Sequence, residues 1–225
     1  MRLARSLSNY DNPKSLGVRR RVKFIGPLLA MIEQAYHRYG CVNLLDLDGK
    51  PRYWHQLPEA YLESRRVSIT LVNIGPITPF VACFRFKFIR ADGCDLHGFA
   101  GGSFHIAHSN SVIEHVGGSP CIERFAREVR RVAEKCFIQT PDFWCPIEPH
   151  CMTPLFHWLP RRVRVWLVRR VALGHWPRAA DRHQAECLVD GARLLTRREL
   201  LLLFPGARII RERILRMPKS LIVII

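Results

Sequence analysis

The sequence has no run of about 18 apolar residues, the length that a membrane-spanning helix needs. Polar residues follow Arg2 and Arg5, where a signal peptide needs an apolar core, so no secretory leader is indicated. The eight cysteines include no C-x-x-C pair, which leaves a zinc ribbon or a thioredoxin-type site without support. Cys41, Cys83 and Cys136 lie in apolar runs, as free thiols do in a reducing compartment. We therefore expect a soluble cytoplasmic protein.

Acidic residues are also scarce: 19 Asp and Glu stand against 35 Lys and Arg, and the net charge is +16. This balance favours acidic partners, namely nucleic acid, anionic lipid surfaces or phosphorylated substrates, although solubility alone also accounts for it. Hydrophobic residues make up 48% of the 225 residues, which suits one globular domain with a full core.

Apolar periodicity predicts strands that alternate with helices. Residues 1–25 are polar and basic, so we expect a loose arm before a domain that spans 26–225. Pro27 suits the first turn of a helix that runs to about Tyr39, and a second helix is predicted from Cys121 to Lys135. This alternation predicts a mostly parallel sheet covered on both faces. The predicted strands are 41–47, 68–73, a segment within 80–89, 104–109 and 136–139.

The end of the chain has a different pattern. Thr196 is predicted to cap a helix over 196–203, with Glu199 three residues on. Two β-rich stretches, 207–215 and 220–225, are separated by Met217-Pro218 and predict a hairpin. Before them lies an insertion at 142–195. Ligands of open α/β sheets bind outside the carboxyl ends of the strands, so this insertion is a candidate lid or substrate wall.

Three motifs occur together in a typical order and spacing: Leu44-Leu-Asp-Leu-Asp-Gly49, Ala91-Asp-Gly-Cys-Asp-Leu96 and the stretch from Gly102 to Val116. With the chain ending from Leu195 onward, they resemble class I S-adenosylmethionine (SAM)-dependent methyltransferases, in particular the methyltransferase type 11 group. The resemblance covers roughly residues 26–225. It implies an α/β, Rossmann-like fold, with a seven-stranded, mostly parallel sheet, helices on both faces and a C-terminal antiparallel hairpin.

The resemblance also implies where the methionine half of SAM binds. Asp46 and Gly49 match the acid and the glycine-rich turn that let backbone approach the cofactor, because a side chain there would fill its space. Ser109 and Asn110 close the fourth strand, where the family frames the reactive methyl.

The adenosine half has three matching positions. Asp92 matches the acid that accepts from the adenine amino group, and Gly93 matches the backbone that meets the ring edge. Asn73 stands where the family has an acid for the ribose hydroxyls. An amide can bond a hydroxyl too, but without the help of a charge.

The turn departs from the family pattern. Asp48 stands where glycine is common, and Lys50, Pro51 and Arg52 stand where small residues are expected. An unpaired carboxylate beside the cofactor would cost on the order of several kcal/mol. We therefore expect Asp48 to contact the cofactor and to pair with Lys50 or Arg52, unless the turn is remodelled. His105 also replaces an acid.

Methyl transfer needs positioning and, for some acceptors, a base. Glu114 and His115 follow the fourth strand, near the expected methyl, and His150 lies in the insertion; these are the catalytic candidates, with packing as the alternative role. The substrate candidates in the insertion are Trp144, Glu148 and His157.

No metal site is predicted. Cys145, His150, Cys151 and His157 offer ligand types, but their spacing matches no standard zinc pattern.

Arg161 to Arg170 alternates arginines with apolar residues. As a helix it has an apolar arc of Val163, Trp166, Leu167 and Val171, which suits an anionic membrane surface or a core-facing helix with its arginines in water.

The sequence leaves three functions open. The first is a SAM-dependent methyltransferase acting on a small or lipid-linked acceptor. The second is a catalytically degenerate protein on that scaffold, suggested by Asp48. The third is an RNA methyltransferase, which rests on charge alone because no known RNA-binding module is present.

Overall fold

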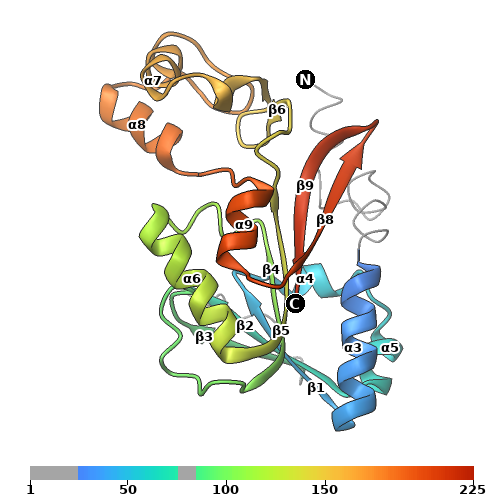
Figure 1. The fold of residues 1–225 in the computed structure, drawn as a ribbon. Helices are drawn as coiled ribbons and strands as arrows, with labels where there is room; N and C mark the ends of the chain where they lie inside the picture. Colours follow the sequence, from blue (N-terminus) through green and yellow to red (C-terminus); the bar gives the residue numbers. More distant parts are fainter. Residues whose placement is uncertain (1–24, 76–84) are drawn as a thin grey trace.

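The computed structural model describes residues 25–75 and 85–225, and seven of its strands form one sheet: β1 (Val42–Leu47), β2 (Val67–Asn73), β3 (Phe86–Arg90), β4 (Phe104–Asn110), β5 (Ala133–Pro141), β8 (Arg208–Ile214) and β9 (Met217–Ile224). Their order is β3-β2-β1-β4-β5-β9-β8 (Figure 1). The first five run parallel, and β9 is antiparallel to both neighbours. The predicted Rossmann-like sheet with its terminal hairpin is confirmed. The predicted arm, apart from residue 25, and residues 80–84 of the third predicted strand lie outside the described residues.

Helices cover both faces of this sheet. Alternate residues of a strand point to opposite faces, so Leu44 of β1 packs in one core and Leu45 in the other. Figure 1 shows α3, in blue, and α6, in green, on opposite sides of the strands. One core contains α3 (Gly26–Tyr39), α4 (Pro51–Trp54) and α5 (Glu59–Ser64), and the other contains α6 (Ser119–Val132) and α9 (Arg197–Leu203).

α3 begins and ends as the sequence predicts. Pro27 lies in its first turn, where the missing N–H is not needed. Gly40 ends it with φ 69°, and its N–H donates to the carbonyl of Tyr36, 2.8 Å away.

The boundary between α6 and β5 differs from the prediction. The helix ends at Val132 and not at Lys135, and the strand begins at Ala133 without a loop. The reason is pairing with β4, because Phe104 is registered with Ala133 and Ile106 with Lys135. The predicted apolar stripe is nevertheless buried: Ile122, Phe125, Ala126, Val129 and Val132.

The terminal hairpin also turns earlier than predicted. Leu215 and Arg216, with φ 48° and 68°, form a two-residue turn, and Met217 and Pro218 belong to β9. Primed turns of this length need positive φ at both positions. Pro218 is tolerated in the strand because it faces Arg213 beside an irregularity in the register, where a ladder N–H can be absent.

The insertion folds around a small core of its own. It contains β6 (Ile147–Glu148), β7 (Thr153–Pro154), η1 (Phe156–Trp158), α7 (Arg161–Arg170) and α8 (Arg182–Asp190). Figure 1 shows β6, α7 and α8 of the insertion together at the top of the view, above α9.

The two ends of the insertion meet at a neck. The Phe143 N–H donates to the Leu195 carbonyl at 3.1 Å, and Arg211 Nε lies 2.7 Å from the buried Asp142 carboxylate. Asp142 also accepts from the Trp144 N–H at 3.0 Å.

α7 buries a different face from the predicted apolar arc. Val165 and Val168 pack in the insertion core, whereas Val163, Trp166 and Val171 are exposed by 39%, 55% and 47%. The core-facing interpretation of that arc is therefore wrong, and only Leu167 packs partly against the core. No helix within the described ranges is long and apolar enough to cross a membrane.

We expect Thr196→Ala to lower the free energy of unfolding by about 1 kcal/mol. The Thr196 side chain accepts from the Glu199 N–H and the Glu199 carboxylate accepts from the Thr196 N–H, the capping box that the sequence predicts. Arg197→Ala, an exposed change in the same first turn, is the matched control for urea unfolding. Equal stability of both variants would contradict a role for this cap.

Candidate functional site

The strand order reverses between β1 and β4, and ligands of open α/β sheets bind at such a switch point. Two neighbouring cavities open there. The β1–β4 cavity, about 260 Å³, extends from the turn after β1 to Tyr53, His108 and Asn110. The β1–β2 cavity, about 150 Å³, lies between Asn73, Asp92 and Phe125. Leu47 and Asp48 line both.

Asp46 is buried at the floor of the β1–β4 cavity, and both of its oxygens are bonded. Oδ2 accepts from Trp54 Nε1 at 2.7 Å, and Oδ1 lies 2.6 Å from His108 Nδ1. The carboxylate therefore connects β1, α4 and β4. Asp46 therefore holds the turn, and because it also lines the cavity its role at a cofactor stays a prediction.

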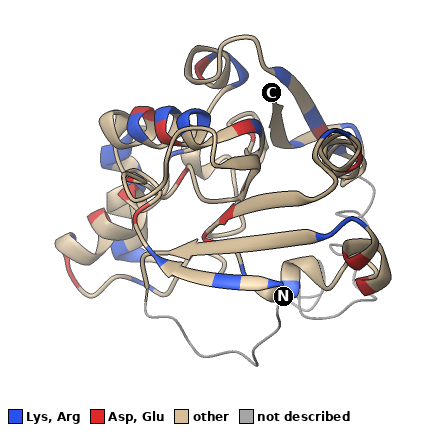
Figure 2. Cartoon of the chain, turned by 90° about the horizontal axis from the view of Figure 1, so that it is seen from below, with Lys and Arg blue, Asp and Glu red and all other residues tan. Residues whose placement is uncertain are grey.

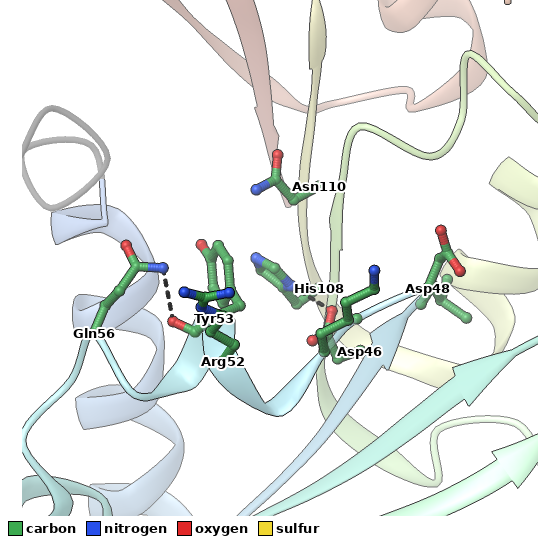
Figure 3. A pocket seen from close by; sticks show the side chains of 10 residues that line it. Asp46, Asp48, Arg52, Tyr53, Gln56, His108 and Asn110 are labelled. Carbon is green, nitrogen blue, oxygen red and sulfur yellow. Dashed lines mark hydrogen bonds and ion pairs between the residues drawn. The ribbon is translucent and has the colours of Figure 1, made fainter. Parts of the chain in front are cut away.

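His108 completes this arrangement on β4. Its ring packs against Tyr53 and is stacked on Phe137, with centroids 4.5 and 5.7 Å away. Figure 3 shows the ring between Asp46 on one side and Tyr53 on the other. Its second nitrogen, Nε2, is buried and has no hydrogen-bond partner among the described residues. A buried polar atom without a partner costs about 1 to 3 kcal/mol, so the cavity contains a site that favours a hydrogen-bonding ligand.

The space beside Gly49 is already filled by protein. A Cβ on Gly49 would overlap the Asp46 carboxylate. The missing side chain therefore makes room for Asp46. Gly49 also lines the β1–β4 cavity, so its role at a cofactor stays a prediction.

Asp48 occupies the position between the two cavities. Its φ of 53° is one that a glycine adopts easily and that Asp tolerates, and its N–H donates to the Val72 carbonyl at 2.7 Å. The side chain is exposed, yet the surrounding protein displaces enough water to raise the pKa of the carboxyl, an effect that Lys50 opposes. Asp48 and Lys50 are both described and form no ion pair, so the part of Lys50 in the predicted pairing is limited to this longer-range attraction.

The adenosine-side residues converge on the β1–β2 cavity as predicted. Asn73, Asp92 and Gly93 line it together with apolar side chains. Asn73 Nδ2 donates to the Gly49 carbonyl at 3.2 Å, so the amide also fixes the turn. Asp92 accepts from the Cys94 N–H at 2.8 Å. A Cβ on Gly93 would approach Phe125 Cε2 to 2.9 Å, so this glycine is required for packing on α6.

Ser109 does not reach either cavity. It is fully buried in β4, and its hydroxyl has no hydrogen-bond partner among the described residues. Asn110, one residue on, lines the β1–β4 cavity instead.

The predicted catalytic residues come together although they lie far apart in sequence. His115 Nε2 is 3.2 Å from His150 Nε2, and Glu114 lies beside them. His150 Nδ1 is 2.6 Å from Glu148 Oε1, and His115 Nδ1 is 2.9 Å from the Gly191 carbonyl. The insertion therefore contacts the loop after β4 at this point.

Two buried carboxyls flank the histidines, and their pKa values are shifted in opposite directions. Burial raises the pKa of Glu114, which accepts from Thr140 Oγ1 at 2.9 Å. Burial acts the same way on Glu148, but the hydrogen bonds from His150 and the Cys151 N–H outweigh it and lower the pKa. Glu148 is thus the ionised partner of His150.

A third cavity, about 720 Å³, lies under the insertion and reaches the size of small-molecule sites. The substrate candidates Glu148 and His157 line it, together with the catalytic candidate His150. Burial lowers the pKa of His157, whose Nε2 donates to the Phe143 carbonyl at 2.8 Å. Trp144 is not part of its wall: the side chain is 54% exposed and contacts Phe143.

No family model matches the sequence, and no curated protein matches it by sequence. Solved structures do resemble it. A SAM-dependent methyltransferase from Archaeoglobus fulgidus has a TM-score of 0.50 and 11% identity, over 88% of this chain and 93% of that chain. The trans-methyltransferase CalH, in complex with SAH, has a TM-score of 0.50 and 16% identity, over 86% of this chain. The fold is that of a SAM-dependent methyltransferase. This methyltransferase fold spans 53% of the CalH chain.

Sequence reasoning missed His108, Trp54 and Thr140. His108 was read only as part of a motif, and Trp54 had no visible link to Asp46 eight residues earlier. The one available signal was the presence of ionisable or hydrogen-bonding side chains within apolar segments, since such groups need buried partners.

We expect Asp46→Ala to destabilise the methyltransferase fold strongly. It would leave the Trp54 and His108 donors buried without an acceptor, at about 1 to 3 kcal/mol each. Asp48→Asn is the matched control, because an exposed change that tolerates positive φ should alter stability by less than about 0.5 kcal/mol. Urea unfolding measures both, and similar losses would show that the Asp46 network is not a special support.

Proposed function

We propose that the protein is a SAM-dependent methyltransferase of the type 11 group. The observation that carries this proposal is that Asn73, Asp92 and Gly93, at positions matched to the family by sequence, line one cavity at the switch point of the sheet, together with the turn residue Asp48. They come from three separate segments of the chain, so their convergence supports the motif match independently.

The β1–β2 cavity has the chemistry for the adenosine half of SAM. Val72, Val112 and Phe125 offer apolar walls for a purine ring, while Asn73 and Asp92 offer polar groups at its edges. Asn73 Nδ2 is bonded to Gly49, which leaves the amide oxygen as the group for a ribose hydroxyl.

The β1–β4 cavity then takes the methionine half, whose carboxylate suits the ammonium of Lys50. The sulfur joins the two halves of the cofactor, and Asp48 lines both cavities. This position suits Asp48 as a counter-charge to the sulfonium, whose methyl is the group that SAM supplies for transfer. On this view the departure from glycine has a function.

The acceptor binds in the cavity under the insertion, which we propose holds a small or lipid-linked molecule. His115 lines the β1–β2 cavity and His150 lines the insertion cavity, so the histidine pair lies between the two. In the metal-free protein, an imidazole Nε2 there would take the acceptor proton as the methyl is transferred.

A catalytically degenerate protein is the rival interpretation. Two observations favour it: each of the two cavities at the switch point is smaller than the roughly 300 Å³ of common ligand sites, and Asp46 fills the space next to Gly49. Cofactor binding decides between the two interpretations.

Calorimetry with SAM and S-adenosylhomocysteine should detect binding, and Asp92→Ala should weaken it by about 1 to 3 kcal/mol. Asp48→Asn should weaken SAM and leave S-adenosylhomocysteine nearly unchanged, because only SAM carries the sulfonium charge. The preference for SAM should also decrease as the pH is lowered. The pKa of Asp48 is raised, so this carboxylate is protonated at a higher pH than an ordinary carboxyl.

Asp48→Asn is also the control for that pH series: whatever dependence it retains belongs to other groups. No binding of either cofactor by the wild-type protein at millimolar concentration would establish the degenerate interpretation. Tighter SAM binding by Asp48→Gly would show that Asp48 obstructs the site.

We also propose that the insertion docks on an anionic membrane surface, with the protein otherwise in the cytoplasm. α7 exposes Val163 and Trp166 on one side, and Arg170 lies over the Trp166 ring at 5.8 Å. Exposed aromatic and basic groups together suit a lipid interface. Figure 2 shows Lys and Arg on several helices and strands, with Asp and Glu on some of the same helices, so the basic residues are not gathered on one element in this view.

Vesicles of phosphatidylcholine with added phosphatidylserine should bind the protein, and salt should weaken the binding. Trp166→Ala should lower the affinity by roughly tenfold, as expected for an apolar side chain of about 1.5 kcal/mol or more. Leu202→Ala, exposed by 74% on α9, is the control. Equal binding to neutral vesicles, or tighter binding to RNA than to anionic vesicles, would contradict this docking.

A further inference from the structure

Glu114, His115 and His150 form a compact group at the contact between the insertion and the loop after β4. One potential ligand atom from each lies within 4.8 Å of the other two. The two histidine Nε2 atoms are closest, at 3.2 Å.

The hydrogen bonds of the two Nδ1 atoms determine whether the facing Nε2 atoms carry a proton or a lone pair. His115 Nδ1 faces the Gly191 carbonyl, which can only accept, so this nitrogen bears a proton. His150 Nδ1 faces the Glu148 carboxylate and likewise donates. Two neutral rings held in this way point their Nε2 lone pairs at each other, an arrangement that requires a cation between them or an extra proton on one ring.

Glu114 supplies an independent observation. It is 1% exposed, and while one oxygen accepts from Thr140, Oε1 is buried without a hydrogen-bond partner among the described residues. An orphaned carboxylate oxygen beside two facing imidazole nitrogens is a donor set of three.

We propose that Glu114, His115 and His150 bind a divalent transition-metal ion, with zinc as the best match. Nitrogen ligands about 2.0 Å from a tetrahedral zinc lie roughly 3.3 Å apart, close to the distance between the two Nε2 atoms. Histidine ligands usually donate their other ring N–H to a carboxylate or carbonyl, and both histidines do so here.

Three protein ligands leave at least one coordination position open. His115 lines the β1–β2 cavity and His150 the insertion cavity, so that position lies between them and suits an oxygen or nitrogen of a bound molecule. If this bound molecule is the methyl acceptor, that assignment rests on the proposed function. Metal binding itself does not rest on it.

The test titrates metal-free protein with zinc and cobalt, without SAM. We expect one equivalent of zinc by calorimetry, and cobalt should give visible absorption of nitrogen and oxygen ligands without a thiolate charge-transfer band. His115→Ala, His150→Ala and Glu114→Gln should each weaken zinc binding at least tenfold, and Glu148→Gln by about tenfold through its hydrogen bond to His150.

His175→Ala, an exposed histidine of the same insertion, should bind zinc as the wild type does. Circular dichroism checks that each variant is folded. If a change at the buried Glu114 disturbs the fold, the His150 variant still tests the site, because His150 lies in the insertion and is only half-buried. Absence of saturable binding would overturn the proposal and leave a proton shared by the two histidines. Binding that survives all three ligand variants, or a thiolate band, would also overturn it. Zinc binding without SAM binding would leave this site standing and reject the methyltransferase.

Discussion

Asp46 joins three elements around the crevice through one buried carboxylate. Its oxygens bond Trp54 at the end of α4 and His108 in β4, so the turn after β1 is tied to the neighbouring strand and to the first helix that follows. Removing a charge from water is costly unless it is fully bonded. The position of Gly49, the course of the chain into Pro51 and the shape of the β1–β4 cavity all follow from satisfying that carboxylate.

The same constraint separates the two carboxylates of the turn. Both oxygens of Asp46 are bonded to other side chains of the protein. Asp48, two residues on, remains exposed between the cavities, and its pKa is raised. A positive φ at Asp48 makes this division of roles work, because it directs the side chain away from the Asp46 network. Figure 3 shows the two side chains pointing apart.

The sequence was sufficient for the sheet and for most helix ends, because these depend on local signals. Pro27, Gly40 and the pair Thr196 and Glu199 each act within a few residues of the chain. The helix boundary at Val132 was not predictable in this way, since pairing with β4 decides it. Among the site residues, Asn73, Asp92 and Gly93 were found by their motif, but the fate of Asp46 depended on His108, 62 residues away.

The close approach of His115 and His150 could not be predicted from the sequence either, because the two residues lie far apart in the chain. Each residue was a candidate alone, but their 3.2 Å approach is created by the fold of the insertion. The sequence-based search for metal ligands considered only residues within the insertion, and the group in the structure takes two of its three members from the loop after β4.

The neck of the insertion has an evolutionary consequence. The chain leaves the sheet at Asp142 and returns at Leu195, and the two ends are hydrogen-bonded neighbours. Loops whose ends lie close together tolerate replacement well, because the entropic cost of closing a loop rises only slowly with its length. The segment between these points is thus a self-contained cassette. Its exchange or divergence would change the walls of the insertion cavity, and His150 would be exchanged with it.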